Sequence, residues 1–243
     1  CETIVPFTID CPVAPPATCQ FRTQTQGGWG SPGNGNNPGT TTASDTIMLS
    51  FCVGTNLGLQ RMEAQLNGGS LASVDTALAT SAGTRYHYVA TFEDGVGSFG
   101  ATGGRMTWHR DGTLIATEDV AFRLSDIEDV NNWLGRSHWS GDRATHAAYN
   151  EVRVYDHAMT AAEITASFAS GPNPSPPQSD MVHRWSFSNP AGNATAGSTI
   201  PDLVGSATAT VRGNGATFSG TAITLPGSTN GNQTPSAISA YVD

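Results

Sequence analysis

The sequence contains no lysine and few charged residues of any kind. Charged side chains occupy 13% of the 243 positions, all eleven basic residues are arginine, and the formal net charge is −9. No cluster of basic residues is present. Proteins that hold nucleic acid need clustered positive charge against the phosphates, so we expect no nucleic-acid partner. An acidic surface suits divalent cations or neutral glycans better than polyanions.

Long apolar runs and the motifs of common enzymes are also missing. No apolar run approaches the roughly 20 residues that cross a bilayer as a helix, so we expect no membrane span. The chain has no Gly-x-Ser-x-Gly elbow, no His-Glu-x-x-His motif and no phosphate-binding loop. Its histidines and serines show no spacing that indicates a catalytic triad. The sequence therefore predicts a protein that is not an enzyme.

Only four cysteines occur, and their spacing argues against the common zinc motifs. No Cys-x-x-Cys pair and no mixed Cys/His ligand spacing is present. Three of the four fall in the first twenty residues, in proline-rich sequence, which favours disulfides formed in an oxidising, extracellular setting. Four cysteines allow three pairings, and the sequence does not choose among them. The disulfide candidates are Cys1, Cys11, Cys19 and Cys52.

The chain is rich in glycine and proline, with 28 and 14 residues, and carries one short helical pattern. This mixture is typical of an all-β sandwich with many turns. Alternating apolar and polar residues predict individual strands. The expected strands are residues 3–9, 47–52, 57–66 and 86–93, followed by a hairpin at 105–116. The Asp111-Gly112 pair predicts the hairpin turn, with Met106 and Trp108 on one face.

The most informative stretch is residues 149–170, which begins as a strand and turns a tight corner. In the strand, Val152 and Val154 share one face. The other face carries four larger or charged side chains: Tyr149, Glu151, Arg153 and Tyr155.

A short helix is predicted directly after this corner. Thr160 stands three residues before Glu163, which is the spacing of a capping box at a helix start. Ile164 and Phe168 then lie one turn apart, which predicts an apolar side on the helix. Gly171 is expected to end it.

These segments resemble known jelly-roll domains. Residues 149–170 are similar to the closing strand and helix of laminin-G-like, concanavalin-type domains, and Asn-Asn-Trp-Leu-Gly-Arg-Ser at 131–137 resembles the preceding strand. Further on, Val-His-Arg-Trp-Ser-Phe-Ser at 182–188 resembles the opening strand of the same family. The next family strands are matched by residues 213–218, 223–227 and 240–243. The resemblance implies an all-β, antiparallel jelly-roll sandwich with one short helix.

The second half of the family pattern therefore comes first in this chain. We divide the chain into a Cys/Pro/Gly-rich segment at 1–40, a second-half-like segment at 41–170, a Pro-rich linker at 171–180 and a first-half-like segment at 181–243. Three explanations stay open: a circular permutation, a window cut from tandem repeats, or halves completed by a neighbouring subunit. The strands that the family order places after residue 243 are not visible, and either residues 1–40 or a partner chain can supply them.

The fold family also includes laminarinase-type glycosidases, which place their carboxylates on one strand as Glu-x-Asp-x-x-Glu. Such enzymes use one carboxylate as the nucleophile and the other as the acid. Glu151 and Asp156 depart from this spacing. They also fall on opposite faces of a regular strand, so they cannot flank one glycosidic bond. A glycosidase is therefore only the third hypothesis.

A ligand-binding loop is expected at residues 137–148, between two aromatic residues, Trp133 and Tyr149. Exposed tryptophan faces stack on sugar rings, and nearby polar side chains bond to hydroxyl groups. The candidate ligand-binding residues are Trp139, His138, Asp142, Arg143 and Tyr149. In the alternative interpretation, Trp133 fills the core and Trp139 only pins the loop. Three aromatic residues in predicted strands are expected to pack in the core or on a sheet face: Trp108, Trp185 and Phe187.

Calcium is the metal that the resemblance implies. Domains of this kind hold the ion through loop carboxylates and carbonyl oxygens. The candidate metal ligands are Asp126, Glu128 and Asp129 in one acidic loop. A solvated acidic loop without a metal is the alternative. Related domains often carry Asp-Glu before the closing strand, and Asn150-Glu151 here removes one of those charges.

These patterns predict an extracellular or cell-surface module without catalytic activity. It would work in adhesion, glycan binding or scaffolding, with glycans or surface and matrix proteins as partners. The alternative function is a structural subunit of an extracellular filament that self-associates by sharing strands between subunits.

Overall fold

The computed structural model describes most of the chain, but with gaps. The described residues are 3–10, 24–25, 46–50, 59–66, 69–81, 83–127, 132–135, 144–173, 180–227 and 240–243. In the first two of these stretches only the backbone is described. No helix in the described part of the chain is long and apolar enough to cross a membrane.

Strands make up most of the described structure, in agreement with the predicted all-β class. The strands before the helix are β1 (Thr3–Asp10), β2 (Gln24–Thr25), β3 (Thr46–Ser50), β4 (Gln60–Gln65), β5 (Ala72–Thr76), β6 (Arg85–Asp94), β7 (Gly104–Arg110), β8 (Thr113–Val120) and β9 (His146–Tyr155). The helix α1 spans Ala161–Ser170. The later strands are β10 (Met181–Trp185), β11 (Gly192–Ala194), β12 (Thr199–Ile200), β13 (Ala209–Arg212), β14 (Ala216–Phe218), β15 (Ile223–Pro226) and β16 (Tyr241–Val242). Two 3-10 turns, Gly100–Thr102 and Leu124–Asp126, complete the described elements.

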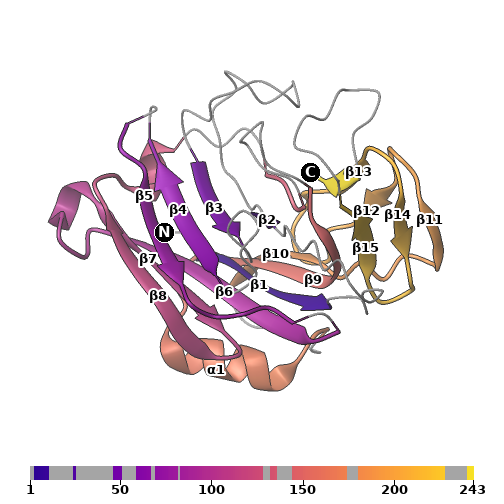
Figure 1. Cartoon of the computed structure of the whole chain (residues 1–243), viewed down its shortest axis with the longest axis horizontal. Helices are drawn as coiled ribbons and strands as arrows, with labels where there is room; N and C mark the ends of the chain where they lie inside the picture. Colours follow the sequence, from indigo (N-terminus) through magenta and orange to yellow (C-terminus); the bar gives the residue numbers. More distant parts are fainter. Residues whose placement is uncertain are drawn as a thin grey trace.

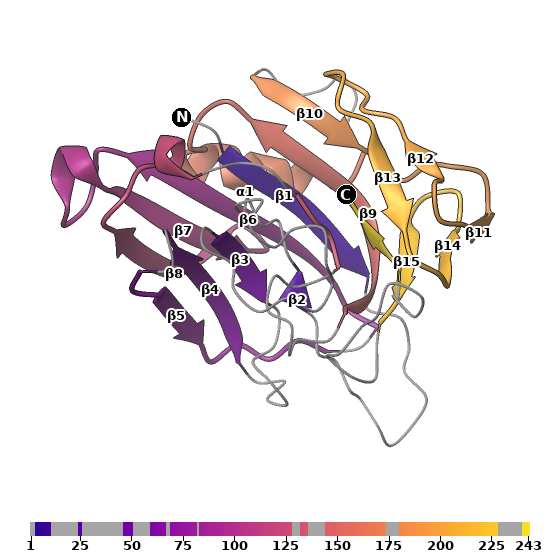
Figure 2. The ribbon, with the colours of Figure 1, turned by 90° about the horizontal axis from the view of Figure 1, so that it is seen from above.

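The strands form an antiparallel sandwich built on one large sheet. This sheet has the order β11-β14-β15-β9-β1-β6-β7-β8, and β10 also pairs with β9. Two smaller sheets, β2-β3-β4-β5 and β12-β13-β16, lie over one face of the large sheet, and α1 covers part of the other face (Figure 1). Figure 2 shows the same layers from above. This is the jelly-roll architecture that the resemblance implied.

The main core lies between the large sheet and the two smaller sheets. Its largest fully buried side chains include Tyr88 and Trp108 from the large sheet, and Met62 from β4. The predicted hairpin is confirmed as β7 and β8, with Met106 and Trp108 both buried. Its turn has the positive φ angles of a two-residue type I′ connection, 52° at Asp111 and 80° at the following glycine.

Strand β9 departs from the face assignment that its sequence predicts. Glu151 and Arg153 lie on the side of α1, whereas Tyr149 belongs to the main core. The register with β1 explains the difference, because Thr8 pairs with Glu151 but Ile9 pairs with Tyr149. One step along β1 thus corresponds to two steps along β9. This β-bulge adds a residue to β9 and reverses the alternation of its side chains.

Helix α1 begins as predicted but presents a different side to the sheet. The capping box is confirmed: Thr160 Oγ1 accepts the N–H of Glu163 at 3.3 Å, and the Glu163 carboxylate accepts the N–H of Thr160 at 2.7 Å. Ile164 is buried, as expected, but Phe168 is 45% exposed. Ser167 takes the place against the sheet, because its hydroxyl receives a hydrogen bond from Arg153.

Two strands that follow the linker, β10 and β15, pair with β9 of the same chain. Along one edge of β9, β10 pairs with residues 152–155 and β15 pairs with residues 146–149. Such pairing within one chain is what a circularly permuted jelly roll requires. The strand predicted at 131–137 is reduced, in its described part, to a single bridge between Leu134 and Val242. That bridge also joins the two segments.

Candidate functional site

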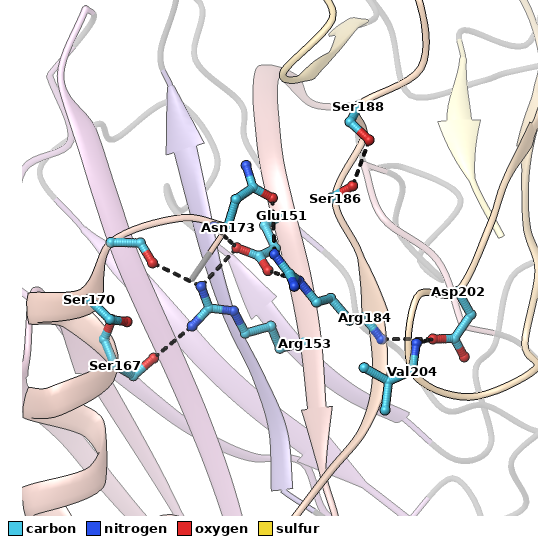
Figure 3. Close-up of polar contacts among 11 residues, drawn as sticks. Glu151, Arg153, Ser167, Ser170, Asn173, Arg184, Ser186, Ser188, Asp202 and Val204 are labelled. Atoms are coloured by element: carbon cyan, nitrogen blue, oxygen red, sulfur yellow. Dashed lines mark hydrogen bonds and ion pairs between the residues drawn. The ribbon is translucent and has the colours of Figure 1, made fainter. Parts of the chain in front are cut away.

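A buried cluster of charged side chains lies between the large sheet and α1 (Figure 3). Glu151 and Arg153 come from β9, Arg184 comes from β10, and Asn173 follows the end of α1. The Glu151 carboxylate accepts three hydrogen bonds, from Arg153 Nη2 at 2.8 Å, from the backbone N–H of Asn173 at 2.6 Å and from Arg184 Nε. Glu151 and Arg153 are 1% and 2% exposed. Both carboxylate oxygens are therefore occupied.

The two arginines extend this cluster to the helix and to the chain beyond it. Arg153 donates to Ser167 Oγ at 3.1 Å and to the backbone carbonyl of Gly171 at 2.9 Å. Gly171 ends α1 with a φ of 67°, as the sequence predicts. Arg184 donates to the side-chain oxygen of Asn173 at 3.3 Å. The cluster thus joins β9, β10, α1 and the start of the linker.

The arginines keep Glu151 ionised in spite of its burial. Burial alone raises the pKa of this carboxyl. The hydrogen bond and charge of Arg153, the N–H of Asn173 and the charge of Arg184 outweigh burial and hold the pKa below its usual value. A glycosidase needs one carboxyl that is free to give a proton and one that is free to attack. Glu151 is bound in an ion-pair cluster instead, which fits a structural role.

His87 on β6 lies at the edge of the same cluster. Its Nε2 is 3.3 Å from Ser167 Oγ, and its ring packs on Phe168 with centroids 5.8 Å apart. Burial and the positive charge of Arg153 lower the pKa of His87 to about 4, against a small opposing effect of Glu151. The imidazole is therefore neutral at pH 7. Ser167 is 0% exposed, so this Ser–His contact is closed to any substrate.

A second polar site lies on β10, with the side chains of His183 and Trp185. The two rings stack with centroids 5.5 Å apart and planes 20° from parallel. His183 keeps 36% of its side chain exposed, and Trp185 is half-buried. The indole N–H of Trp185 donates to the carbonyl of Ala207 at 2.7 Å. The two rings therefore lie stacked and partly exposed on β10, in a fixed orientation.

The side chain of Asp202 holds the His183 ring in this orientation. Its carboxylate lies 2.6 Å from His183 Nδ1 and is only 1% exposed. Burial alone raises the pKa of Asp202, but the backbone N–H of Arg184, the His183 ring and the N–H groups of Val204 and Gly205 outweigh it. The pKa is held at about 2. A carboxylate can only accept, so Nδ1 donates and Nε2 is left pointing away from Asp202.

The loop around Asp202 approaches His183 very closely. A side chain at Gly205 would place its Cβ 2.6 Å from His183 Nδ1 and 2.6 Å from the carbonyl of Val182. Only glycine fits there. The N–H of Leu203 donates to the carbonyl of Arg184 at 2.8 Å, so the loop also covers the outer edge of β10. Leu203 itself is 50% exposed beside this surface.

The structure places only part of the predicted ligand site. Tyr149 is 0% exposed, so its predicted role in ligand binding is wrong, and the bulge in β9 that turns it into the core is the reason. Trp133 is 4% exposed and packs edge-on against Tyr241, as the alternative interpretation expected. The other ligand candidates lie outside the described residues: His138, Trp139, Asp142 and Arg143.

The predicted calcium site is also described only in part. The Asp126 carboxylate accepts the N–H of Arg123 at 2.9 Å and pairs with its guanidinium at 3.3 Å. Glu128 and Asp129 lie outside the described residues, so calcium at this loop stays a prediction. Within the described ranges, no three His, Cys, Asp or Glu side chains gather as a metal site. All four disulfide candidates fall in the gaps: Cys1, Cys11, Cys19 and Cys52.

Comparison with known proteins identifies the family. Residues 15–165, more than half of the chain, match the laminin G model of the concanavalin A-like lectin/glucanases superfamily. The chain therefore belongs to this superfamily. The match does not reach residues 181–243. No curated protein matches the sequence.

A solved structure with a similar fold is the native heptameric SAP-like pentraxin from Limulus polyphemus. Its sequence is 11% identical to this chain, the alignment covers 73% of each chain, and the TM-score is 0.39. A similarity at this level says nothing about ligands or assembly.

The sequence interpretation missed both polar sites. It placed Glu151 and Arg153 on one face of a strand but gave no sign that this face is buried. The third member, Arg184, lies 31 residues after Arg153, beyond a Pro-rich linker. Trp185 was expected in the core or packed on a sheet face, and the structure packs its partly buried ring against the core. A local signal did exist, because Asp202 is followed by Gly205, a pattern typical of a loop that folds around a carboxylate.

Proposed function

We propose that this protein is an extracellular adhesion or glycan-binding module without catalytic activity. Its membership in a superfamily of lectins and glucanases supports a carbohydrate ligand. The engagement of Glu151 by two arginines supports binding without hydrolysis. The low content of basic residues supports a neutral rather than an anionic glycan.

The stacked pair of His183 and Trp185 is the observation that carries this proposal. Sugar rings bind to flat aromatic surfaces through their apolar faces, with polar groups at the edge to bond hydroxyls. The pair supplies the surface, and Nε2 of His183 supplies a polar atom beside it. The Asp202 loop fixes both rings in advance, which lowers the entropy lost on binding.

Retention on immobilised neutral polysaccharides tests this function. Replacing His183 with alanine removes one ring of the pair and leaves Trp185 packed against the core. We expect affinity to fall about tenfold, because one stacking and one hydrogen-bonding partner are lost. Trp139→Ala, in the loop that the sequence predicts, should be compared in the same experiment. The matched control is Phe99→Ala, which removes an exposed aromatic ring from the β6–β7 connection.

The outcomes separate the two surfaces. Loss of retention with a His183→Ala variant that circular dichroism shows to be folded, together with full retention of the Phe99 variant, supports the β10 surface. Full retention of His183→Ala with loss in Trp139→Ala would move the site to residues 137–148. A native chain that no polysaccharide retains would contradict glycan binding altogether.

The second candidate function is a structural subunit of an extracellular filament that assembles by strand sharing. The position of β1 favours it. This strand lies in the middle of the large sheet, yet residues 11–23 separate it from the next described strand. A central strand on a long connection is an element that neighbouring subunits can exchange.

A further inference from the structure

Strand β1 completes the large sheet by filling a slot between two strands that are distant in sequence. It pairs antiparallel with β6 over five residues, from Pro6 opposite Val89 to Asp10 opposite Arg85. On its other side it pairs antiparallel with β9, from Thr3 to Asp10. Figure 2 shows β1 lying between β6 and β9. The slot is therefore lined by backbone groups of β6 and β9.

Leaving the slot empty would be costly. β6 and β9 are the most continuously buried of the large-sheet strands whose side chains are described. Without β1, the inward edges of both strands would lose their hydrogen-bond partners in the middle of the sandwich. Each buried backbone group left unpaired costs on the order of 1–3 kcal/mol. An open slot of this kind is a strong acceptor for any strand of suitable register.

The connection of β1 is long enough to reach a neighbouring molecule. Residues 11–23 join it to β2, which pairs with β3 in the second layer. Thirteen residues span up to about 45 Å when extended, and a compact domain of this length is also about 45 Å across. The strand can therefore enter its own slot or the slot of an adjacent copy.

Residues 181–243 are held to their own chain in a different way. The chain leaving α1 is fixed by the bond from Arg153 to the carbonyl of Gly171 and by the bond from Asn173 to Glu151. The chain entering β10 is fixed by a bond from the N–H of Asp156 to the carbonyl of Asp180 at 3.2 Å. Both ends of that linker thus lie beside β9. The linker before β10 is thus anchored at both described ends, whereas the number of residues between β1 and β2 is enough to reach a second copy.

We propose that the slot between β6 and β9 is a docking site for β1 of a second copy of this chain. This inference rests on the second candidate function. Each copy donates one strand and receives one, which is a head-to-tail contact that continues into a filament unless a ring closes. The backbone hydrogen bonds that β1 makes with β6 and β9 are the same whether β1 comes from its own chain or from a second copy. Exchange is therefore favoured where the chain concentration approaches the effective concentration of the tethered strand, of order 1 mM.

Isotope mixing with a photo-crosslinker tests this exchange on the full chain. Arg85, which is exposed and opposite Asp10, is replaced by p-benzoylphenylalanine. Chains with ¹⁴N and with ¹⁵N are mixed in equal amounts, unfolded and refolded together at high concentration without reductant, and irradiated. The crosslinked peptides that contain residues 3–10 are then analysed by mass spectrometry. If β1 is exchanged, about half of these crosslinks join chains of different isotope.

A matched control places the same crosslinker at Arg105, which pairs with Asp119 inside the β7–β8 hairpin. Its crosslinks must stay within one isotope in every case. Particle size, measured by light scattering and negative-stain images of the same mixture, separates the remaining outcomes. Mixed crosslinks in long regular particles support the inference. Unmixed crosslinks in long particles overturn β1 exchange but leave a structural subunit. Unmixed crosslinks in monomers overturn both and leave glycan binding untouched.

Discussion

Replacing Glu151 with alanine is expected to lower the free energy of unfolding by about 3–5 kcal/mol. The substitution removes the only carboxylate that the described structure places against Arg153 and Arg184. Arg153 is 2% exposed, so its charge would be left in a buried environment without its ion-pair partner. Urea unfolding followed by circular dichroism measures the change. A loss of that size is a large fraction of the roughly 5–15 kcal/mol that stabilises an ordinary domain.

The exposed ion pair between Arg61 and Asp75 provides the control. Its atoms are as close as those of the buried cluster, at 2.7 Å, but both side chains are about one-third exposed. Asp75→Ala is expected to cost no more than about 1 kcal/mol. If Glu151→Ala costs as little as Asp75→Ala, the cluster does not hold residues 181–243 to β9, and this account of the fold fails.

Acidification is expected to destabilise the protein through His87. Its pKa is about 4 in the folded state and 6.5 as the reference for the unfolded state. Between these values the unfolded chain binds a proton that the folded chain does not, so stability falls as the pH falls. Above pH 6.5 His87 has no effect, and below about pH 4 the loss is complete. The full loss is about 3 kcal/mol.

The variant His87→Gln isolates this effect from other titrating groups. Glutamine keeps a polar partner for Ser167 but does not titrate. As the pH falls from 7 to 4, the variant is expected to gain about 3 kcal/mol in unfolding free energy relative to the native chain. Parallel stability profiles across this range would show that His87 titrates normally in the folded state.

The general fold could be predicted because its signals are local. The alternation in 86–93, the Asp111-Gly112 turn and the capping box at Thr160 each depend on neighbouring residues, and each is confirmed. The resemblance to laminin-G-like domains was confirmed for the same reason, since its motifs are short and contiguous. The order of the strands across the sheet, by contrast, cannot be predicted from any one segment, because it depends on pairing between distant segments.

The failures arise where a contact joins distant residues. Tyr149 was placed on the wrong face because a bulge depends on the register with β1, a partner some 140 residues away. Ile164 and Phe168 were placed together on one apolar side of α1, and periodicity does not reveal that Ser167 faces the sheet to accept a hydrogen bond from Arg153. Of the five ligand-binding candidates, Tyr149 is the one that lies within the described residues, and its side chain is buried. The β10 surface was missed because Asp202 orients His183 from outside the strand.

The central functional claim is that glycans bind to the surface formed by His183 and Trp185. Nuclear magnetic resonance of the indole N–H groups tests it most directly. The signal of Trp185 is assigned with a Trp185→Phe variant, and the native chain is titrated with an oligosaccharide from a polysaccharide that retains it. The account predicts a saturating shift of the Trp185 signal, while buried Trp108, with 0% exposure, stays unchanged. A shift confined to Trp139, or no shift at any indole, would contradict it.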